Sequence, residues 1–213
     1  MRIDLIAYEG LDELDLVGPL EVFRRAQAAG APVEARIIAE TLVPIRCANG
    51  LVLHPDAVPS AAAPADAVLA PGGGWVSGNA CGVRLQAARD YWPAVISKAH
   101  GRGALIMSVC TGAMLLARAG VLTGRRATTH WAATADLEPF GVTLLPARVV
   151  DDGDIITAGG VSCGIDLALW AVARLTGGPS VAKKIAGALV YSWDEGAVAG
   201  PVRQPGDPGS ARR

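Results

Sequence analysis

Short aliphatic runs alternate with longer amphipathic segments along most of this chain, and this alternation constrains the fold more than any other feature. The aliphatic runs have strand length and are predicted at Ile3–Tyr8, Val33–Ile38, Ala67–Ala70, Leu105–Val109 and Ile155–Thr157. The helical segments are predicted at Asp12–Ala29, Arg84–His100, Ser162–Leu175 and Val181–Tyr191. Strands that are separated by helices pair in parallel and are covered on both faces. The pattern therefore predicts an α/β fold, a single doubly wound domain around a mostly parallel sheet.

Shorter segments refine this prediction. Val43–Arg46 and Leu51–Leu53 are typical of a small hairpin, and Arg126–Trp131 is strand-like. Pro19 lacks an N–H and would be costly deep inside a helix. We therefore place the start of the first helix near Leu16, with Pro19 in its first turn.

Size and charge set further bounds. A chain of 213 residues, 51% of them hydrophobic, can bury a large core as one domain. We assign residues 1–195 to that domain and residues 196–213 to a tail rich in Pro, Gly and Arg. A net charge of −1 gives no electrostatic case for binding nucleic acid or an anionic membrane. Charges interrupt each apolar run, and Asp4 and Glu9 stand where a signal peptide is apolar, so we expect a cytoplasmic protein.

The cysteines and glycines argue against a metal or another cofactor. Cys47, Cys81, Cys110 and Cys163 lie far apart and form no C-x-x-C pair, which disfavours a zinc site or a redox motif. In a reducing compartment we expect them to be free thiols. The glycine run at 72–74 has neither spacing that is typical of nucleotide phosphate binding.

Cys110 is the strongest candidate for chemistry. It follows the predicted strand Leu105–Val109 and precedes a helical pattern, with Ser108 two residues before it and Gly112 two after. Small flanking residues permit the sharp strand-to-helix turn that presents a nucleophile. The helix that begins at Thr111 would favour the thiolate through its N-terminal partial charge. Because cysteine is often a small core residue, packing is the alternative.

Two other loops should lie at the same edge of the sheet. Asp15 follows the first strand, where it either caps the helix or exchanges a proton with the thiol. Gly73 and Gly74 follow the strand Ala67–Ala70, and their backbone N–H groups are candidate donors to a bound oxyanion. A simple turn is the alternative for these glycines.

Further residues are candidates for the walls of the site. His130 either lines the pocket, orients the thiolate or has a structural role. Trp131 and Trp75 either form an aromatic wall or pack in the core. Thr111 offers a hydroxyl and an N–H to a ligand or simply begins a helix, and Cys163 is predicted to pack.

Several motifs together resemble one known family. They are Ala70-Pro-Gly-Gly-Gly74, Ser108-Val-Cys-Thr-Gly-Ala113, Thr128-Thr-His-Trp131, and Thr157-Ala-Gly-Gly-Val161 followed by Gly164-Ile-Asp-Leu-Ala-Leu169. Their order is similar to that in the ThiJ/PfpI superfamily, and the resemblance runs from Met1 to about Tyr191. It implies a class I glutamine-amidotransferase-like fold, which is flavodoxin-like. Thr111 stands where peptidase-like members have histidine, and Asp15 where many members have glutamate; the pair resembles the isonitrile hydratase branch.

The resemblance implies roles for these residues. Cys110 would be the nucleophile, Asp15 its acid/base partner and Thr111 a positioning group. The expected reaction is hydration of an isonitrile, R–NC, to an N-substituted formamide through a cysteine thioimidate, without a cofactor, and the expected assembly is a homodimer. Two alternatives stay open: glyoxalase-like chemistry on an α-oxoaldehyde, and a non-catalytic ligand or redox sensor.

Overall fold

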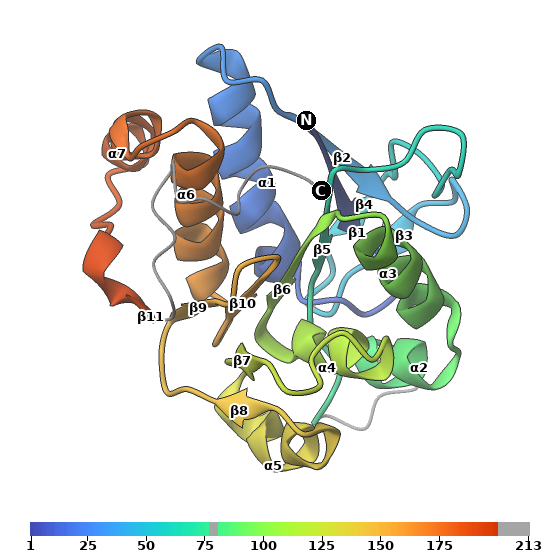
Figure 1. Cartoon of the computed structure of the whole chain (residues 1–213). Coiled ribbons are helices and arrows are strands. Elements are labelled where there is room, and N and C mark those ends of the chain that lie inside the picture. The colour runs from blue at the N-terminus through green and yellow to red at the C-terminus, as the bar shows by residue number, and fades with distance from the viewer. Residues whose placement is uncertain (77–80, 200–213) are drawn as a thin grey trace.

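A mostly parallel sheet forms the centre of the molecule. The computed structural model describes residues 1–76 and 81–199, and in that part of the chain seven strands pair in the order β11-β9-β10-β6-β5-β1-β2 (Figure 1). They are β1 (Arg2–Ile6), β2 (Glu34–Ile38), β5 (Ala67–Ala70), β6 (Leu105–Val109), β9 (Val149–Asp151), β10 (Ile155–Ala158) and β11 (Val198–Ala199). Among the described strands of this sheet, only β9 and β10 pair in the antiparallel sense. The prediction of a mostly parallel α/β sheet is confirmed.

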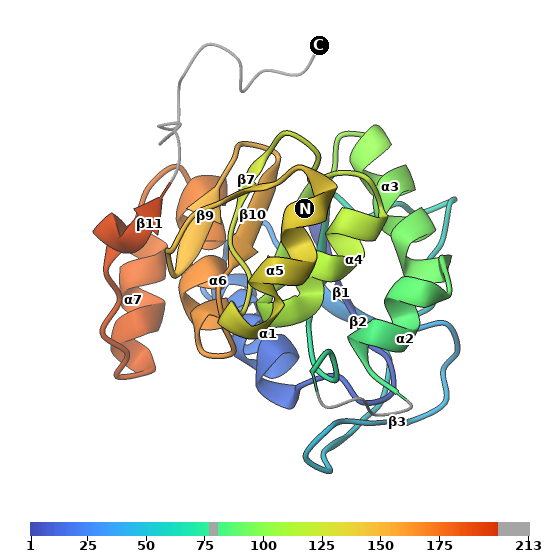
Figure 2. The same cartoon turned by 90° about the horizontal axis from the view of Figure 1, so that it is seen from below.

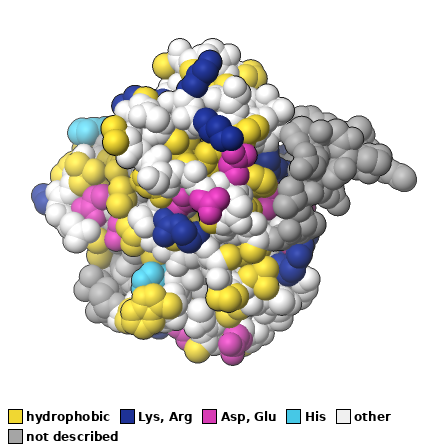
Figure 3. Space-filling view, turned by 90° about the vertical axis from the view of Figure 1, so that its left-hand side faces the viewer, with side chains coloured by type: hydrophobic (Ala, Val, Ile, Leu, Met, Phe, Trp, Pro, Cys, Tyr) yellow, Lys and Arg dark blue, Asp and Glu magenta, His cyan; other side chains and the backbone are white. Residues whose placement is uncertain are grey.

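Helices cover both faces of the sheet (Figures 1 and 2). One face carries α1 (Glu13–Ala28), α6 (Cys163–Leu175) and α7 (Ser180–Ala188). The other carries α2 (Val83–Ala88), α3 (Tyr91–Gly101) and α4 (Ala113–Arg118). This is the doubly wound, flavodoxin-like arrangement that we predicted. On the side nearest α7, acidic and basic side chains are interspersed with hydrophobic ones, so neither positive nor negative charge dominates that face (Figure 3).

The core explains why the strands are aliphatic on both faces. Every residue of β5 and β10 is buried, and Phe23 and Trp92 are among the largest fully buried side chains on the two flanking layers. Burial of this apolar surface is the main favourable term in folding. Since both faces of the sheet are covered, polar side chains reach solvent at the ends of the strands, where open α/β sheets bind ligands.

Smaller elements lie outside the sheet. β3 (Ile45–Arg46) and β4 (Val52–Leu53) form the predicted antiparallel hairpin. β7 (Arg126–Ala127) pairs with β8 (Thr143–Leu144), and between them lie the 3₁₀ turn η2 (Trp131–Ala133), α5 (Thr134–Leu137) and the 3₁₀ turn η3 (Glu138–Phe140). The strand-like prediction at 126–131 holds for its first two residues only. At Thr128 the backbone N–H donates instead to the side chain of Thr157 at 2.8 Å.

The first helix begins earlier than we predicted. Asp12 caps α1 by accepting a hydrogen bond from Leu14 N at 3.2 Å, and the first turn carries Glu13 and Asp15. A capping carboxylate and an acidic first turn stabilise a helix N-terminus. Pro19 therefore lies inside the helix, where it has no N–H to donate to the carbonyl of Asp15. The predicted start near Leu16 was wrong.

The helix predicted at 84–100 is in fact two helices, α2 and α3. Asp90 separates them in the left-handed conformation, with φ of 59°. Pro93 falls in the first turn of α3, where a missing N–H costs little. The amphipathic pattern continues across the break, so hydrophobic periodicity alone did not reveal it.

The C-terminal segment is partly ordered into the sheet. Residues 196–199, which we assigned to the tail, complete the 3₁₀ turn η4 (Glu195–Ala197) and form β11, which pairs with β9. Residues 200–213 lie outside the described residues. Within the described part, no helix combines the length and apolarity needed to cross a membrane.

Between β6 and α4 the chain turns sharply at Cys110. Cys110 has φ of 56°, a left-handed conformation that residues other than glycine adopt infrequently. The turn η1 (Cys110–Gly112) then leads into α4. A Cβ at Gly112 would overlap Ala70 O and lie 2.8 Å from Pro71 O. The turn therefore packs directly on the backbone that leaves β5.

Gly112→Ala should destabilise the fold by about 2 kcal/mol or more, because the added methyl meets backbone oxygens that cannot rotate away. Gly187→Ala is the matched control, since Gly187 is helical and nothing lies within 4 Å of its Cβ position. Alanine there should stabilise by about 0.5–1 kcal/mol. Urea unfolding of both variants measures the difference. Equal midpoints would contradict the close packing of the turn.

Candidate active site

The thiol of Cys110 lies at the carboxyl end of the central strand β6. The residue is only 6% exposed, so the sharp turn holds it buried and not in open solvent. Thr129 Oγ1 donates a hydrogen bond to Cys110 O at 2.9 Å and fixes the turn from the other side. A non-glycine residue held at positive φ is a form of local strain that is concentrated at functional sites.

Asp15 is fully buried on the first turn of α1. Its Oδ2 accepts a hydrogen bond from Gly72 N at 2.8 Å, while its buried Oδ1 has no hydrogen-bond partner among the described protein groups. Burial raises the pKa of Asp15 to about 8, with help from the charge of Asp12; hydrogen bonds with Gly72 N–H and the Cys110 thiol oppose the rise. Because Asp12 caps the helix, Asp15 is not the cap. It is a buried carboxyl beside the thiol.

Thr111 connects the thiol to the glycine loop. Its Oγ1 accepts a hydrogen bond from Gly73 N at 3.1 Å. Its own N–H and hydroxyl hydrogen-bond to the sulfur of Cys110, and both lower the pKa of the thiol. Thr111 therefore uses both of its polar groups on the sulfur, and a loop glycine orients its hydroxyl.

The expectation that the helix start holds Cys110 as a thiolate is not met. Burial raises the pKa of the Cys110 thiol well above its usual value, and the charge of Asp15 raises it further. The two donors of Thr111 oppose these effects but do not overcome them. Both groups keep their protons near neutral pH, because burial disfavours each charged form and ionising both would place like charges side by side.

Gly72, which we did not predict to be a site residue, lies against both Thr111 and Asp15. A Cβ at Gly72 would lie 2.6 Å from Thr111 N and 2.9 Å from Asp15 Oδ2, so only glycine fits. Gly73 N–H is already bonded to Thr111 Oγ1, and Gly73 is therefore a positioning group and not the free oxyanion donor that we predicted. Gly74 lies against the backbone of Cys81 and Gly82.

The predicted aromatic wall divides into two parts. Trp75 is buried, donates from Nε1 to Asp136 Oδ2 at 2.6 Å, and has the Arg84 guanidinium 4.6 Å above its ring. These contacts fix Trp75 as a packing residue. Trp131, in contrast, is 78% exposed, with its ring 5.2 Å from that of His130. His130 Nδ1 accepts a hydrogen bond from Ala132 N at 3.3 Å, which assigns the imidazole to capping η2.

A hollow of about 590 Å³ opens beside the thiol turn. Its lining is mostly apolar and comprises Thr128, Thr129, Trp131, Thr134, Glu138, Leu144, Leu145, Pro146, Ala147, Arg148, Gly159 and Cys163. Thr129 holds the carbonyl of Cys110, and Gly159 follows Ala158, which pairs with Val109. The exposed Trp131 forms the rim. The hollow is therefore next to the turn that carries the thiol.

Cys163 lies on the wall of this hollow, although we predicted a packing role. Its side chain is 7% exposed at the start of α6. Burial raises the pKa of its thiol, and the charge of Arg148 only partly offsets this. A neutral, buried thiol in this position forms part of the wall, and Cys110 remains the thiol that the carboxyl contacts.

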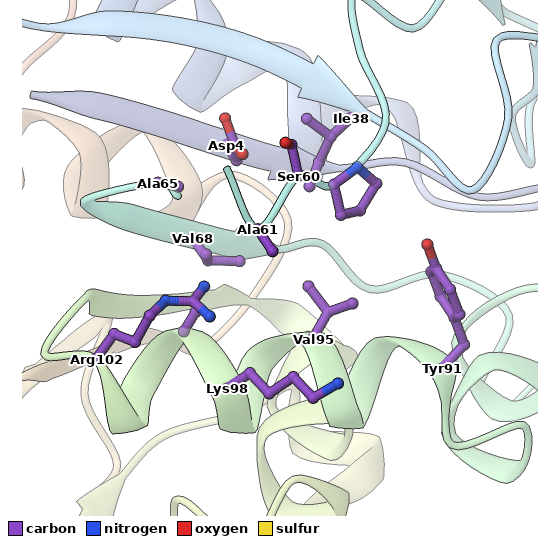
Figure 4. A pocket seen from close by; sticks show the side chains of 12 residues that line it. Asp4, Ile38, Ser60, Ala61, Ala65, Val68, Tyr91, Val95, Lys98 and Arg102 are labelled. Atoms are coloured by element: carbon purple, nitrogen blue, oxygen red, sulfur yellow. The ribbon is translucent and has the colours of Figure 1, made fainter. Parts of the chain in front are cut away.

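A second cavity of about 240 Å³ lies between α3 and the segment 59–65 (Figure 4). Val68 and Val95 line it, with Lys98 of α3 and Arg102, just after α3, at its side. None of the residues around the thiol lines it. In the described part of the chain, no group of three His, Cys, Asp or Glu side chains is arranged to hold a metal ion.

The chain is similar to characterised proteins over most of its length. It is 33% identical to the isonitrile hydratase of Pseudomonas putida over 177 residues, which cover 83% of this chain and 73% of that protein. It is 29% identical to the Parkinson disease protein 7 homolog of Danio rerio over 180 residues, which cover 83% of this chain and 90% of that one.

The fold of the chain is also similar to that of a solved structure. The crystal structure of a ThiJ/PfpI family protein from Pseudomonas syringae superposes with a TM-score of 0.78 at 32% identity, over 91% of this chain and 76% of that chain. The model of the DJ-1/PfpI family matches residues 1–191, the same span over which the sequence motifs run. The chain belongs to the DJ-1/PfpI family.

Proposed function

We propose that the protein hydrates isonitriles, R–NC, to N-substituted formamides. The observation that supports this most is the pairing of the Cys110 thiol with one buried carboxyl, Asp15, whose pKa is raised to about 8. A carboxyl that keeps its proton near neutral pH can give it to a substrate and later take one from water. The similarity to an isonitrile hydratase over 83% of the chain supports the same reaction.

In the first step Cys110 Sγ bonds to the terminal carbon of the isonitrile. The proton of the thiol passes through the carboxyl of Asp15 to the same carbon, which gives the neutral thioimidate R–N=CH–S–Cys110. The N–H and hydroxyl of Thr111 stabilise negative charge that develops on the sulfur. Because the thiol and the carboxyl each start with a proton, the step needs no other acid.

In the second step water adds to the thioimidate carbon. Asp15 gives its proton to the substrate nitrogen as it accepts one from the water, which gives R–NH–CH(OH)–S–Cys110. The C–S bond then breaks, the sulfur regains its proton, and R–NH–CHO leaves. The sum is R–NC plus water to the formamide, so no cofactor is consumed.

The hollow beside the turn supports an apolar R group. Leu144, Leu145 and Pro146 offer apolar contact, and Trp131 offers an aromatic face at the rim. The linear –NC group, which has no hydrogen atoms to donate, would lie on the side of the hollow where Thr129 bonds to the backbone of Cys110. This division of the site favours small isonitriles with an alkyl or aryl substituent as the substrate class.

The proposal includes a homodimer that acts in the cytoplasm. Leu42 and Val43, adjacent in the chain just before β3, are 61% and 65% exposed. Neighbouring exposed apolar side chains of this kind are candidates for a surface that another chain covers. Neither a membrane nor nucleic acid is part of the proposal.

Cys110→Ala should abolish formamide formation from cyclohexyl isocyanide, and Asp15→Asn should lower kcat by at least about 100-fold, the usual contribution of a general acid/base. Cys163→Ala and Asp12→Asn are matched controls that should keep most activity, since asparagine caps a helix as well as aspartate does. Mass spectrometry of the formamide is the measurement. A wild-type rate in Cys110→Ala would exclude the mechanism.

The same assay separates the alternatives. Formation of lactate from methylglyoxal without glutathione, and no turnover of any isonitrile, would favour glyoxalase-like chemistry. Oxidation of Cys110 to a sulfinate under mild peroxide, again without turnover, would favour a sensor.

Asp15→Asn should also change how stability depends on pH. Unfolding lowers the pKa of Asp15 from about 8 to 3.8, so the unfolded chain releases a proton between these values and the stability of the wild type falls as pH rises through that window. Asparagine does not titrate, so Asp15→Asn lacks this fall in stability with rising pH. Urea unfolding from pH 5 to pH 9 should therefore show a stability advantage of Asp15→Asn that grows with pH. Cys110→Ala keeps the carboxyl and should follow the wild type; parallel curves for all three proteins would contradict the buried, protonated carboxyl.

A further inference from the structure

Tyr8 supports the glycine loop from beneath the site. It lies two residues after β1, its side chain is 4% exposed, and its hydroxyl donates to Pro71 O at 2.5 Å and to Gly72 O at 3.2 Å. Both acceptors belong to the loop that follows β5. Tyr8 therefore joins the end of one strand to the loop after its neighbour in the sheet.

The two residues that follow Pro71 carry the hydrogen bonds on which the site depends. Gly72 N–H donates to Asp15 Oδ2 at 2.8 Å, and Gly73 N–H donates to Thr111 Oγ1 at 3.1 Å. The carbonyl of Gly72 accepts from Asp12 N at 3.0 Å as well as from Tyr8. The carbonyl oxygens of the loop thus accept hydrogen bonds from Tyr8 and Asp12. Its N–H groups donate hydrogen bonds to Asp15 and Thr111.

From this arrangement we infer that Tyr8 is a positioning residue for the chemistry at Cys110. Its hydroxyl holds the Pro71–Gly73 backbone so that one N–H meets Asp15 and the next meets Thr111. The expected change in kcat rests on the proposed function, whereas the expected change in the reactivity of the Cys110 thiol does not. Tyr8 acts through the loop and does not reach the reacting atoms.

The hydroxyl is suited to this role because it stays neutral. Burial raises the pKa of Tyr8 well above its usual value, and the nearby carboxyl of Asp15 and thiol of Cys110 raise it further. A neutral phenol keeps its proton to donate to the loop carbonyls at any pH at which the enzyme works. The titratable groups that act on Asp15 or are acted on by it are Asp12 on α1, Cys110 after β6, Tyr8 after β1 and Cys163 on α6.

Tyr8→Phe tests the inference because it removes one oxygen and keeps the buried ring. If the loop loses its support, Gly73 N–H no longer orients Thr111 Oγ1, and the hydroxyl contact that lowers the pKa of Cys110 is weakened. Alkylation of Cys110 by iodoacetamide, followed peptide by peptide with mass spectrometry, should then rise with a midpoint at higher pH than in the wild type. The kcat for cyclohexyl isocyanide should fall about tenfold with KM changed less, the effect expected when one hydrogen bond is lost.

Tyr91→Phe is the matched control, since Tyr91 lines the separate cavity by α3 (Figure 4). It should leave the alkylation midpoint and kcat unchanged. An unshifted midpoint in Tyr8→Phe, or an equal shift in both variants, would overturn the positioning role. The alkylation needs no isonitrile, so it decides the role of Tyr8 even if the wild type turns over no isonitrile and the proposed function fails.

Discussion

The hydrogen bond from Gly72 N–H to the buried carboxyl of Asp15 is the contact on which the site depends. Burying a carboxyl without compensation is costly, and Oδ1 of this carboxyl has no hydrogen-bond partner within the described part of the chain. The protein accommodates it by keeping the group protonated near neutral pH and by giving its second oxygen a single backbone donor. The result is a carboxyl that retains a transferable proton beside a thiol that also retains one.

The parallel sheet brings this contact together from distant parts of the chain. Asp15 lies after β1, Gly72 after β5 and Cys110 after β6, and the three strands are neighbours with their carboxyl ends at one edge. Close approach then requires the absence of side chains at Gly72 and Gly112. The left-handed turn at Cys110 points the thiol into the same space. Each requirement is local, but only the fold combines them.

Much of this could be predicted from the sequence. The strand–cysteine–helix pattern located the turn at Cys110, and the parallel sheet predicted that Asp15 lies at the same edge. The structure differs from the predictions where burial or a competing hydrogen bond decides the state of a side chain. Helix dipole reasoning favoured a thiolate at Cys110, whereas desolvation and the neighbouring carboxyl favour the thiol.

Other features could not be read from a pattern. Gly72 and Tyr8 carry no motif of their own, and their roles follow from which backbone groups they meet. Trp75 and Trp131 look alike in sequence, but one is fixed by Asp136 and Arg84 while the other is exposed at a rim. Pro19 was misplaced because the cap at Asp12 outweighs the cost of one missing hydrogen bond.

The protonation state of the Asp15 carboxyl is the quantity that tests this account most directly. It can be followed by ¹³C NMR of protein labelled at aspartate Cγ, with Asp15→Asn used to assign the resonance. The account predicts that this resonance titrates with a midpoint near pH 8, far above the ordinary value of 3.8. A carboxyl that is already fully ionised at pH 6 would contradict it.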